Sequence, residues 1–196
     1  MGNLIRMPHS ELHATIEVLD ALGVEPEDFE RVRQDRSLAE KVAEAFASAR
    51  EAAKNIFRVT VDYSRSLAEM IGAGKYDWVN FDITAEHFPI TGTGKAEVNL
   101  VLVHFNRAMS TNEVLDDFKK RGLRPAKIEE LLALGERYPD LQREFPIVAL
   151  GSAFENPRGR RYCPFLWRVG AERGLDLRLL ERGWSGSFRF LAVLES

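Results

Sequence analysis

The spacing of apolar residues changes near residue 55, and this change limits the folds open to the chain. Before it, Leu12, Ile16 and Leu19 recur at the spacing of an amphipathic helix, and residues 38–54 are rich in alanine, a strong helix former. After it, the segment IFRVTVDY alternates every second residue in β-forming side chains. A helical region over residues 1–54, followed by a sheet-forming region over residues 55–196, is therefore predicted.

The second region contains the clearest local signals. Ser110 and Glu113 form the pattern of a capping box, and Gly122 ends the helix that they start. The segment AEVNLVLVHFN is apolar on both faces, with His104 on the face of Leu100, which predicts a central strand. Helices are expected over residues 64–74, 110–122 and 126–140, and strands over 56–63, 76–84, 96–106, 145–152, 160–169, 175–181 and 188–195. The predicted class is α+β, with a small mixed or antiparallel sheet.

Charge is unevenly distributed along the chain. Residues 1–118 hold 12 Lys and Arg against 20 Asp and Glu, a net charge of −8, whereas residues 119–196 hold 15 against 10, a net charge of +5. Such complementarity suits packing of the two parts, head-to-tail association into a homo-oligomer, or a basic surface for acidic ligands. The charges alone leave these alternatives open.

Cysteine usage and hydropathy indicate the compartment. Cys163 is the only cysteine, so an intrachain disulfide and a multi-cysteine metal site are excluded. The beginning MGNLIRMPHS lacks the apolar core of a signal peptide, and no run of about eighteen apolar residues occurs. We therefore expect a cytoplasmic protein that does not enter a membrane.

The segment TGTGKAE at residues 91–97 looks like a phosphate-binding loop. That motif needs a glycine where Pro89 stands and a hydroxyl where Ala96 stands. With both ends wrong, the segment is better interpreted as a glycine-rich turn before a strand. No nucleotide or other cofactor is predicted.

Histidines and carboxylates give no metal site. His9 and His13 are spaced for one helix face, but Glu11 does not complete a zinc motif and no third ligand is evident. His104 falls on a strand expected to be buried, where a hydrogen-bonded core histidine is the plainer interpretation. Asp62, Asp77 and Asp82 could converge at strand ends, although their spacing does not require it.

Nucleophiles are also poorly placed, so no catalytic residue is predicted. Ser152 lacks the nucleophile-elbow motif, and Cys163 lies in an apolar setting that predicts an inert, buried thiol. An enzyme that pairs His87 with Asp77, Asp82 or Glu86 for acid–base chemistry remains the first alternative.

The last 36 residues interleave aromatic residues and arginines, as recognition surfaces do. The same pattern also describes strands with one buried and one solvated face. If the arginines share a face, an acidic protein or single-stranded nucleic acid is a suitable partner.

Residues 97–196 resemble the C-type-lectin-like fold, in which two helices precede a small loop-rich sheet and the last strand returns beside the first. The segments LRPAKIEEL and SFRFLAV stand where disulfide-free members, the formylglycine-generating-enzyme-like and hypervariable ligand-binding proteins, have a conserved helix start and final strand. The same stretch is similar to C-terminal parts of uncharacterised bacterial proteins. The order Glu155-Asn156-Pro157 departs from the sugar-binding Glu-Pro-Asn motif, and one cysteine cannot supply the catalytic pair of the sulfatase-modifying enzymes.

The resemblance implies a scaffold that presents a ligand surface on its late loops, around residues 167–172 and 182–187. We therefore predict a non-enzymatic module that binds a protein or small ligand, with nucleic-acid binding through the basic C-terminal half as a further alternative. The predicted binding residues are Trp167, Arg168, Glu172, Arg173, Arg182 and Trp184.

Overall fold

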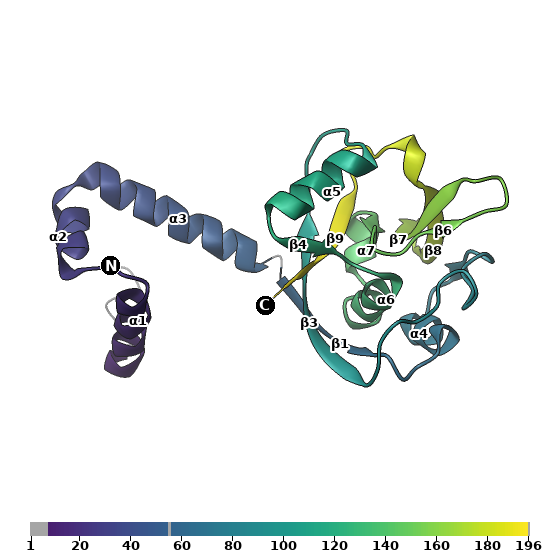
Figure 1. The fold of residues 1–196 in the computed structure, drawn as a ribbon, viewed down its shortest axis with the longest axis horizontal. Coiled ribbons are helices and arrows are strands. Elements are labelled where there is room, and N and C mark those ends of the chain that lie inside the picture. The colour runs from purple at the N-terminus through teal and green to yellow at the C-terminus, as the bar shows by residue number, and fades with distance from the viewer. Residues whose placement is uncertain (1–7, 55, 196) are drawn as a thin grey trace. The chain divides into compact units, whose positions relative to one another are not determined.

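The computed structural model describes residues 8–54 and 56–195, and the side chains of residues 9–12 and 47–54 lie outside this description. The chain divides into two compact units, Met1–Lys54 and Asn55–Ser196, called the helical unit and the sheet unit below. Figure 1 shows the helices of the first unit and the sheet of the second.

The described part of the helical unit consists of α1 (His9–Ala21), α2 (Pro26–Gln34) and α3 (Arg36–Lys54). Pro26 has the backbone angle that a first helical residue needs, and the Asp28 carboxylate accepts a hydrogen bond of 3.1 Å from the Glu25 N–H. The prediction of helices is confirmed for the described residues of this region, 8–54. Phe29 and Phe46 are 49% and 64% exposed, and none of the side chains described between residues 8 and 46 is buried.

The sheet unit contains one mixed sheet in the order β1-β3-β9-β5-β7-β8-β2, with β4 beside β9 and β6 beside β7. Its described strands are β1 (Ile56–Asp62), β2 (Trp78–Val79), β3 (Lys95–Val103), β4 (Leu123–Pro125), β5 (Ile147–Val148), β6 (Phe154–Glu155), β7 (Arg161–Val169), β8 (Glu172–Leu179) and β9 (Arg189–Leu194). The pairs β2–β8 and β5–β9 are parallel, and the other pairs are antiparallel. The α+β prediction is therefore confirmed.

Two predicted strands are much shorter than expected: the strand over residues 145–152 is reduced to β5 and the strand over residues 76–84 to β2. The expected strand over residues 76–84 shrinks to β2, because Asn80 turns the chain: its side-chain oxygen accepts a 2.9 Å hydrogen bond from the Asp82 N–H, and its amide donates to the Asp176 carboxylate at 2.7 Å. Side-chain hydrogen bonds of this kind compete with a sheet ladder.

Strands of this sheet bury both faces. In β9, Leu191 belongs to one hydrophobic cluster and Phe190 to the other, and in β5 Ile147 and Val148 divide in the same way. The expected two-sided burial of the strand over residues 96–106 is likewise confirmed, except that β3 ends at Val103 and leaves His104 exposed. The prediction of a buried His104 was wrong because the chain leaves the sheet one residue earlier.

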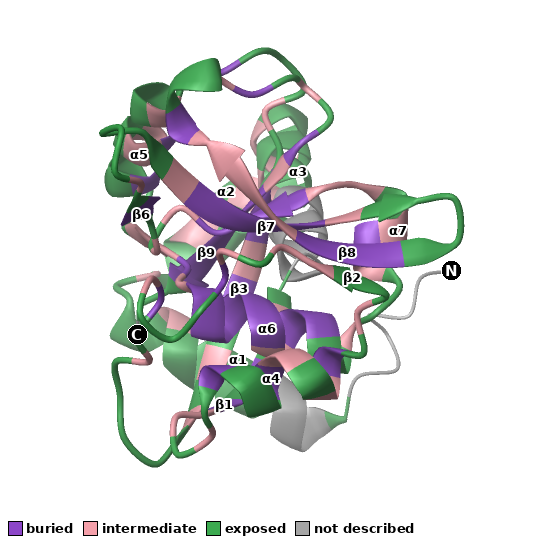
Figure 2. Cartoon of the chain, turned by 90° about the vertical axis from the view of Figure 1, so that its right-hand side faces the viewer, coloured by how far each residue is buried: buried purple, intermediate pink, exposed green. Residues whose placement is uncertain are grey.

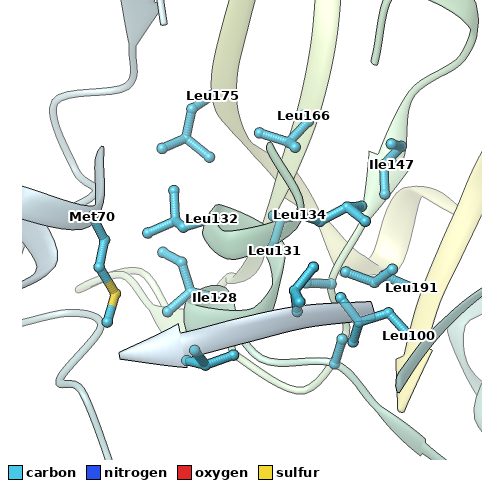
Figure 3. Packing of buried hydrophobic residues seen from close by; sticks show 14 of the residues in the cluster. Met70, Leu100, Ile128, Leu131, Leu132, Leu134, Ile147, Leu166, Leu175 and Leu191 are labelled. Carbon is cyan, nitrogen blue, oxygen red and sulfur yellow. The ribbon is translucent and has the colours of Figure 1, made fainter. Parts of the chain in front are cut away.

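The first cluster lies under α4 (Leu67–Gly74) and α6 (Ile128–Arg137), followed along the chain by the short α7 (Leu141–Glu144). Figure 3 shows leucines of α6 facing Leu100, Leu166 and Leu175 of the sheet. Four apolar residues of α6 that recur at helical spacing are buried: Ile128, Leu131, Leu132 and Leu134. The burial of α6 and of the middle of β7 is visible in Figure 2.

The second cluster lies between the other face of the sheet and α5 (Thr111–Lys120). Val114 and Phe118 of this helix are buried against Phe190 and Trp184. The predicted capping box is present, since the Glu113 N–H donates to the Ser110 hydroxyl at 3.2 Å and the Glu113 carboxylate accepts from the Ser110 N–H at 2.7 Å. This box fixes where α5 starts, beside the loop that precedes β9.

Candidate functional site

A groove of about 900 Å³ runs between the start of α5 and the loop before β9. It is called the C-terminal groove, and its lining includes Ser110, Thr111, Arg161, Arg178, Arg182 and Trp184. The volume is within the range of pockets that hold small ligands or a few residues of a peptide.

Backbone and side-chain hydrogen bonds hold the two walls of the groove together. Met109 and Trp184 form an isolated bridge, with N–H to carbonyl distances of 3.0 and 2.8 Å in the two directions. The Trp184 indole donates to the Thr111 hydroxyl at 3.0 Å, and this hydroxyl donates to the Leu180 carbonyl at 2.8 Å. Trp184 is only 3% exposed, so its packed ring anchors the loop, and it lines one side of the groove.

Arg178 forms the floor of the groove. Its guanidinium lies over the rings of Phe188 and Trp184, at 4.7 and 5.5 Å from their centroids. One terminal nitrogen donates weakly to the Gly183 carbonyl at 3.4 Å, whereas the buried Nε has no hydrogen-bond partner among the described residues. The aromatic faces thus position a cation whose hydrogen-bonding capacity is only partly used.

Arg161 and Arg182 add two exposed cations at the rim, and neither forms an ion pair with a described residue. Of the two carboxylates at the groove, Glu113 is already engaged by Ser110 and lies 3.5 Å from a guanidinium nitrogen of Arg107. The backbone and hydroxyl hydrogen bonds from Ser110 lower the pKa of Glu113. Glu181 is the remaining acidic group of the lining. The groove is therefore a cationic site with three arginines available to a ligand.

A second, smaller hollow of about 240 Å³ contains His87, Lys127, Glu129 and Ser152. The His87 ring stacks on Phe154 at 4.1 Å, and its Nδ1 lies 2.8 Å from the Asp82 carbonyl oxygen. Because a carbonyl oxygen only accepts, Nδ1 carries a proton in this contact and Nε2 is the ring nitrogen left for another partner.

The groups around His87 have other partners. Ser152 Oγ accepts from the Ile128 N–H at 2.9 Å, and the Lys127 ammonium donates to the Thr91 hydroxyl at 2.9 Å. The alternative of an acid–base enzyme expects His87 to contact the carboxylate of Asp77, Asp82 or Glu86. The hydrogen-bond partner of His87 is instead a backbone carbonyl. Asp77 instead accepts a hydrogen bond of 2.7 Å from the Arg173 N–H.

Five of the six predicted binding residues divide between two places, and Arg168 lies in neither. Arg182 and Trp184 line the C-terminal groove, whereas Trp167, Glu172 and Arg173 line a separate hollow at the β2–β8 edge of the sheet. Arg168 is exposed near the β7–β8 turn and donates to the Gly170 carbonyl at 3.0 Å.

Arg173 points into the protein. Its guanidinium donates to the carbonyls of Gly74 at 2.7 Å and Gly135 at 2.8 Å, and to the side-chain oxygen of Gln142 at 3.2 Å, and it lies 5.0 Å from the Tyr76 ring centroid. Gly74 ends α4 and Gly135 lies in the last turn of α6, so one buried cation satisfies carbonyls at two helix C-termini. Burial lowers the pKa of this guanidinium.

Other candidates lie apart from these sites. Cys163 is fully buried, and its burial raises the pKa of the thiol. His104 Nε2 lies 2.7 Å from the Gly186 carbonyl. His13 pairs with Glu17 at 3.3 Å, and the side chain of His9 lies outside the described residues. In the described part of the chain, no three His, Cys, Asp or Glu side chains gather as metal ligands would.

Arg161 and Arg178 belong to the stretch of interleaved aromatic residues and arginines, but neither they nor Thr111 were among the predicted binding residues. The sequence shows that Arg161 is two residues from Cys163, which was expected to be buried. The structure adds that Cys163 pairs directly with Arg178, so both cations lie on the sheet face of a buried cysteine. This strand pairing could not be derived from the sequence.

Comparisons with known proteins identify no relative. No family model matches the chain, and neither a curated protein nor a solved structure matches it. The resemblance to the C-type-lectin-like fold therefore stays a prediction. Every helix within residues 8–54 and 56–195 is too short or too polar to span a bilayer.

Proposed function

We propose that the protein is a non-enzymatic binding module whose C-terminal groove takes an acidic segment of a partner protein. One observation carries the proposal: Arg161, Arg178 and Arg182 meet at one groove, while the nearest carboxylate, Glu113, is held by Ser110 and Arg107. Guanidinium groups with free donors suit carboxylates, which they bind through two parallel hydrogen bonds. Arg182 and Trp184 lie on one of the two late loops, residues 182–187, where the lectin-like resemblance expects a ligand surface.

An acidic peptide suits the groove better than a nucleic acid does. Proteins that bind single strands stack bases on aromatic rings that solvent can reach. Trp184, the aromatic residue of this groove, is 3% exposed and packs edge-on against Phe188 and Phe190. Glu181 adds one negative charge to the lining, which disfavours a ligand that is negatively charged along its whole length. The proposed ligand therefore presents a few separated carboxylates.

Charge reversal with a matched control tests this function. A fluorescent glutamate-rich peptide is titrated into the full chain and into the Arg161→Glu, Arg182→Glu double variant. We expect the double variant to bind at least about tenfold more weakly, since each rim cation supports both encounter and affinity. Arg158→Glu, Arg160→Glu is the control: both arginines are exposed, lie outside the groove, and change the net charge equally.

Equal weakening in the two double variants would show that only overall charge matters, and would overturn the proposal. Single-stranded DNA of matched charge is titrated in parallel. If it binds more tightly than the peptide, with a steep dependence on salt, the nucleic-acid alternative replaces this one. The helical unit is acidic, so the helical unit of a second copy could serve as the acidic segment and join two chains into a homo-oligomer. Sedimentation of the same variants tests this.

The second candidate is an enzyme that uses His87. The observation in its favour is the contact of Nδ1 with the Asp82 carbonyl, which directs a basic Nε2 away from that carbonyl. One measurement distinguishes the two functions: His87→Gln leaves peptide binding unchanged if the groove is the site.

A further inference from the structure

Two tryptophans face each other across a glycine at the β2–β8 edge of the sheet. Trp78 of β2 pairs with Gly174 of β8, and Gly174 pairs on its other side with Trp167 of β7. Residues paired directly across strands project to the same face, so the row places an indole on each side of a residue without a side chain. A Cβ at Gly174 would collide with the Trp167 indole, which leans over it.

The two indoles form two perpendicular walls. Their centroids are 6.4 Å apart and their planes meet at 79°, beside a hollow of about 390 Å³. Trp78 is 45% exposed and Val169, which also lines the hollow, is 57% exposed. This arrangement is called the aromatic corner and comprises Trp78, Trp167, Val169, Glu172, Gly174 and Asp176. Arg173 also lines the hollow, although its guanidinium is held by the carbonyls of Gly74 and Gly135.

The charges at the aromatic corner are negative. Glu172 and Asp176 lie two residues on either side of Gly174 along β8, and therefore project to the same face as the indoles. Asp176 is fixed by hydrogen bonds of 2.7 Å from the Asn80 amide and the Leu177 N–H. Glu172 forms no ion pair with a described residue. Both carboxylates are thus available to a cation in the hollow.

Cations of the chain do not fill the corner. Arg173 lies between the two carboxylates in sequence, but its guanidinium is on the other side of β8, held by the carbonyls of Gly74 and Gly135. Arg168 donates to the Gly170 carbonyl in the β7–β8 turn. Aromatic walls and carboxylates therefore surround a space that no described basic side chain occupies.

We propose that the aromatic corner binds a quaternary or methylated ammonium group, such as that of a choline-type ligand or a methylated lysine. Indole faces attract cations more strongly than other aromatic side chains do, and perpendicular rings contact a methylated ammonium group on two sides. The methyl groups cover the apolar walls, while Glu172 and Asp176 balance the charge. An uncharged ligand of the same shape would gain only the apolar contact.

This site is separate from the C-terminal groove. Both lie on the same face of the β7–β8 hairpin, but Gly174 and Arg178 are four residues apart along β8, which corresponds to roughly 13 Å. The ligand charges are opposite as well. Failure of one proposal therefore leaves the other standing.

The test is a titration of the ¹⁵N-labelled full chain with choline chloride, followed by the three indole N–H signals. We expect the Trp78 and Trp167 signals to shift and the Trp184 signal to stay in place. The matched probe is the uncharged carbon isostere of choline, in which a tert-butyl group replaces the trimethylammonium group. It should bind at least about tenfold more weakly, because it lacks the cation–π attraction.

Variants localise the effect. Trp78→Ala should weaken choline binding by about tenfold or more, whereas Trp78→Phe should keep part of it. Glu172→Gln should weaken it by roughly threefold, because an exposed carboxylate adds modest attraction. Phe81→Ala is the control: Phe81 is 85% exposed and lies outside the hollow, so its loss should change nothing.

Three results would overturn the proposal. One is equal affinity for choline and its isostere, which would indicate a plain apolar pocket. Another is unchanged choline affinity in Trp78→Ala, provided that the spectrum of the variant stays dispersed. The third is the absence of any indole shift at all attainable choline concentrations.

Discussion

In the sheet unit, Leu131 and Phe118 lie fully buried on opposite faces of one sheet, whereas in the helical unit Phe29 and Phe46 are about half exposed or more. Both units contain amphipathic helices, so the difference is not one of sequence pattern. It is whether a second layer covers the apolar face. In the sheet unit, β-strands from distant parts of the sequence, such as β1 and β9, supply that layer for α5 and α6.

This contrast indicates different sources of stability. Isolated helices are marginal in water, and most of their stability in proteins comes from packing of an apolar face. The sheet unit has that packing on both faces. Within the helical unit, the described contacts are local ones, such as the pair of Arg33 and Glu30 at 2.7 Å and that of Arg36 and Glu40 at 3.0 Å, which contribute little. Mutations should therefore have very different costs in the two units.

The largest expected difference concerns apolar truncation. Leu131→Ala in α6 should lower the free energy of unfolding by about 3 kcal/mol, through lost burial and a cavity. Phe29→Ala in α2 should change it by less than about 0.5 kcal/mol, since this side chain is 49% exposed. Urea unfolding is followed by far-UV circular dichroism, which reports both units, and by tryptophan fluorescence, which identifies the transition of the sheet unit because all three tryptophans lie there. If both variants lower the free energy of unfolding by a similar amount, the two units do not differ in the packing of their helices.

A smaller effect is expected for the buried cation that joins two helices. Arg173→Met should cost about 2 kcal/mol, because it leaves the carbonyls of Gly74 and Gly135 without their donor. Arg168→Met, an exposed arginine on the same hairpin, is the matched control and should be nearly neutral. The same urea titration applies. If Arg173→Met unfolds no more easily than the control, the guanidinium does not cap these helices.

The smallest effect concerns the start of α5. Ser110→Ala removes the cap hydroxyl and should cost about 1 kcal/mol at neutral pH. Together with the Ser110 backbone N–H, the Ser110 hydroxyl lowers the pKa of Glu113, so the part of the cap that involves this carboxylate is present above the ordinary glutamate pKa and is lost as pH falls through the lowered value in the folded state. The variant should therefore approach the parent chain in acid. An NMR titration should also show a higher Glu113 pKa in Ser110→Ala; an unchanged value would contradict the capping geometry.

Local signals in the sequence were sufficient for much of the fold. The capping box of Ser110 and Glu113 involves residues three apart, and the inward face of α6 follows from its own periodicity, so both could be predicted without knowing any partner. The alternation of β3 also predicted burial on two sides. The end of β3 before His104 could not be read in this way, because it depends on where β9 stops pairing.

The sites depend on contacts between distant parts of the chain. Arg173 donates to a carbonyl 99 residues away, and alternation alone could not show that it points inward while Glu172 points out. Trp78 faces Trp167 only because a two-residue parallel pairing joins β2 to β8. Aromatic and arginine content identified the right part of the chain, but strand register decided which residues meet.

The most direct test of the central claim maps where an acidic ligand binds. A glutamate-rich peptide is added to the ¹⁵N-labelled full chain, and signals are followed for the Trp184 indole, the Thr111 amide and the amides around His87. Binding in the C-terminal groove predicts that the Trp184 and Thr111 signals shift together and return when salt is added. Shifts confined to the surroundings of His87 and Ser152, with the Trp184 indole unmoved, would contradict it.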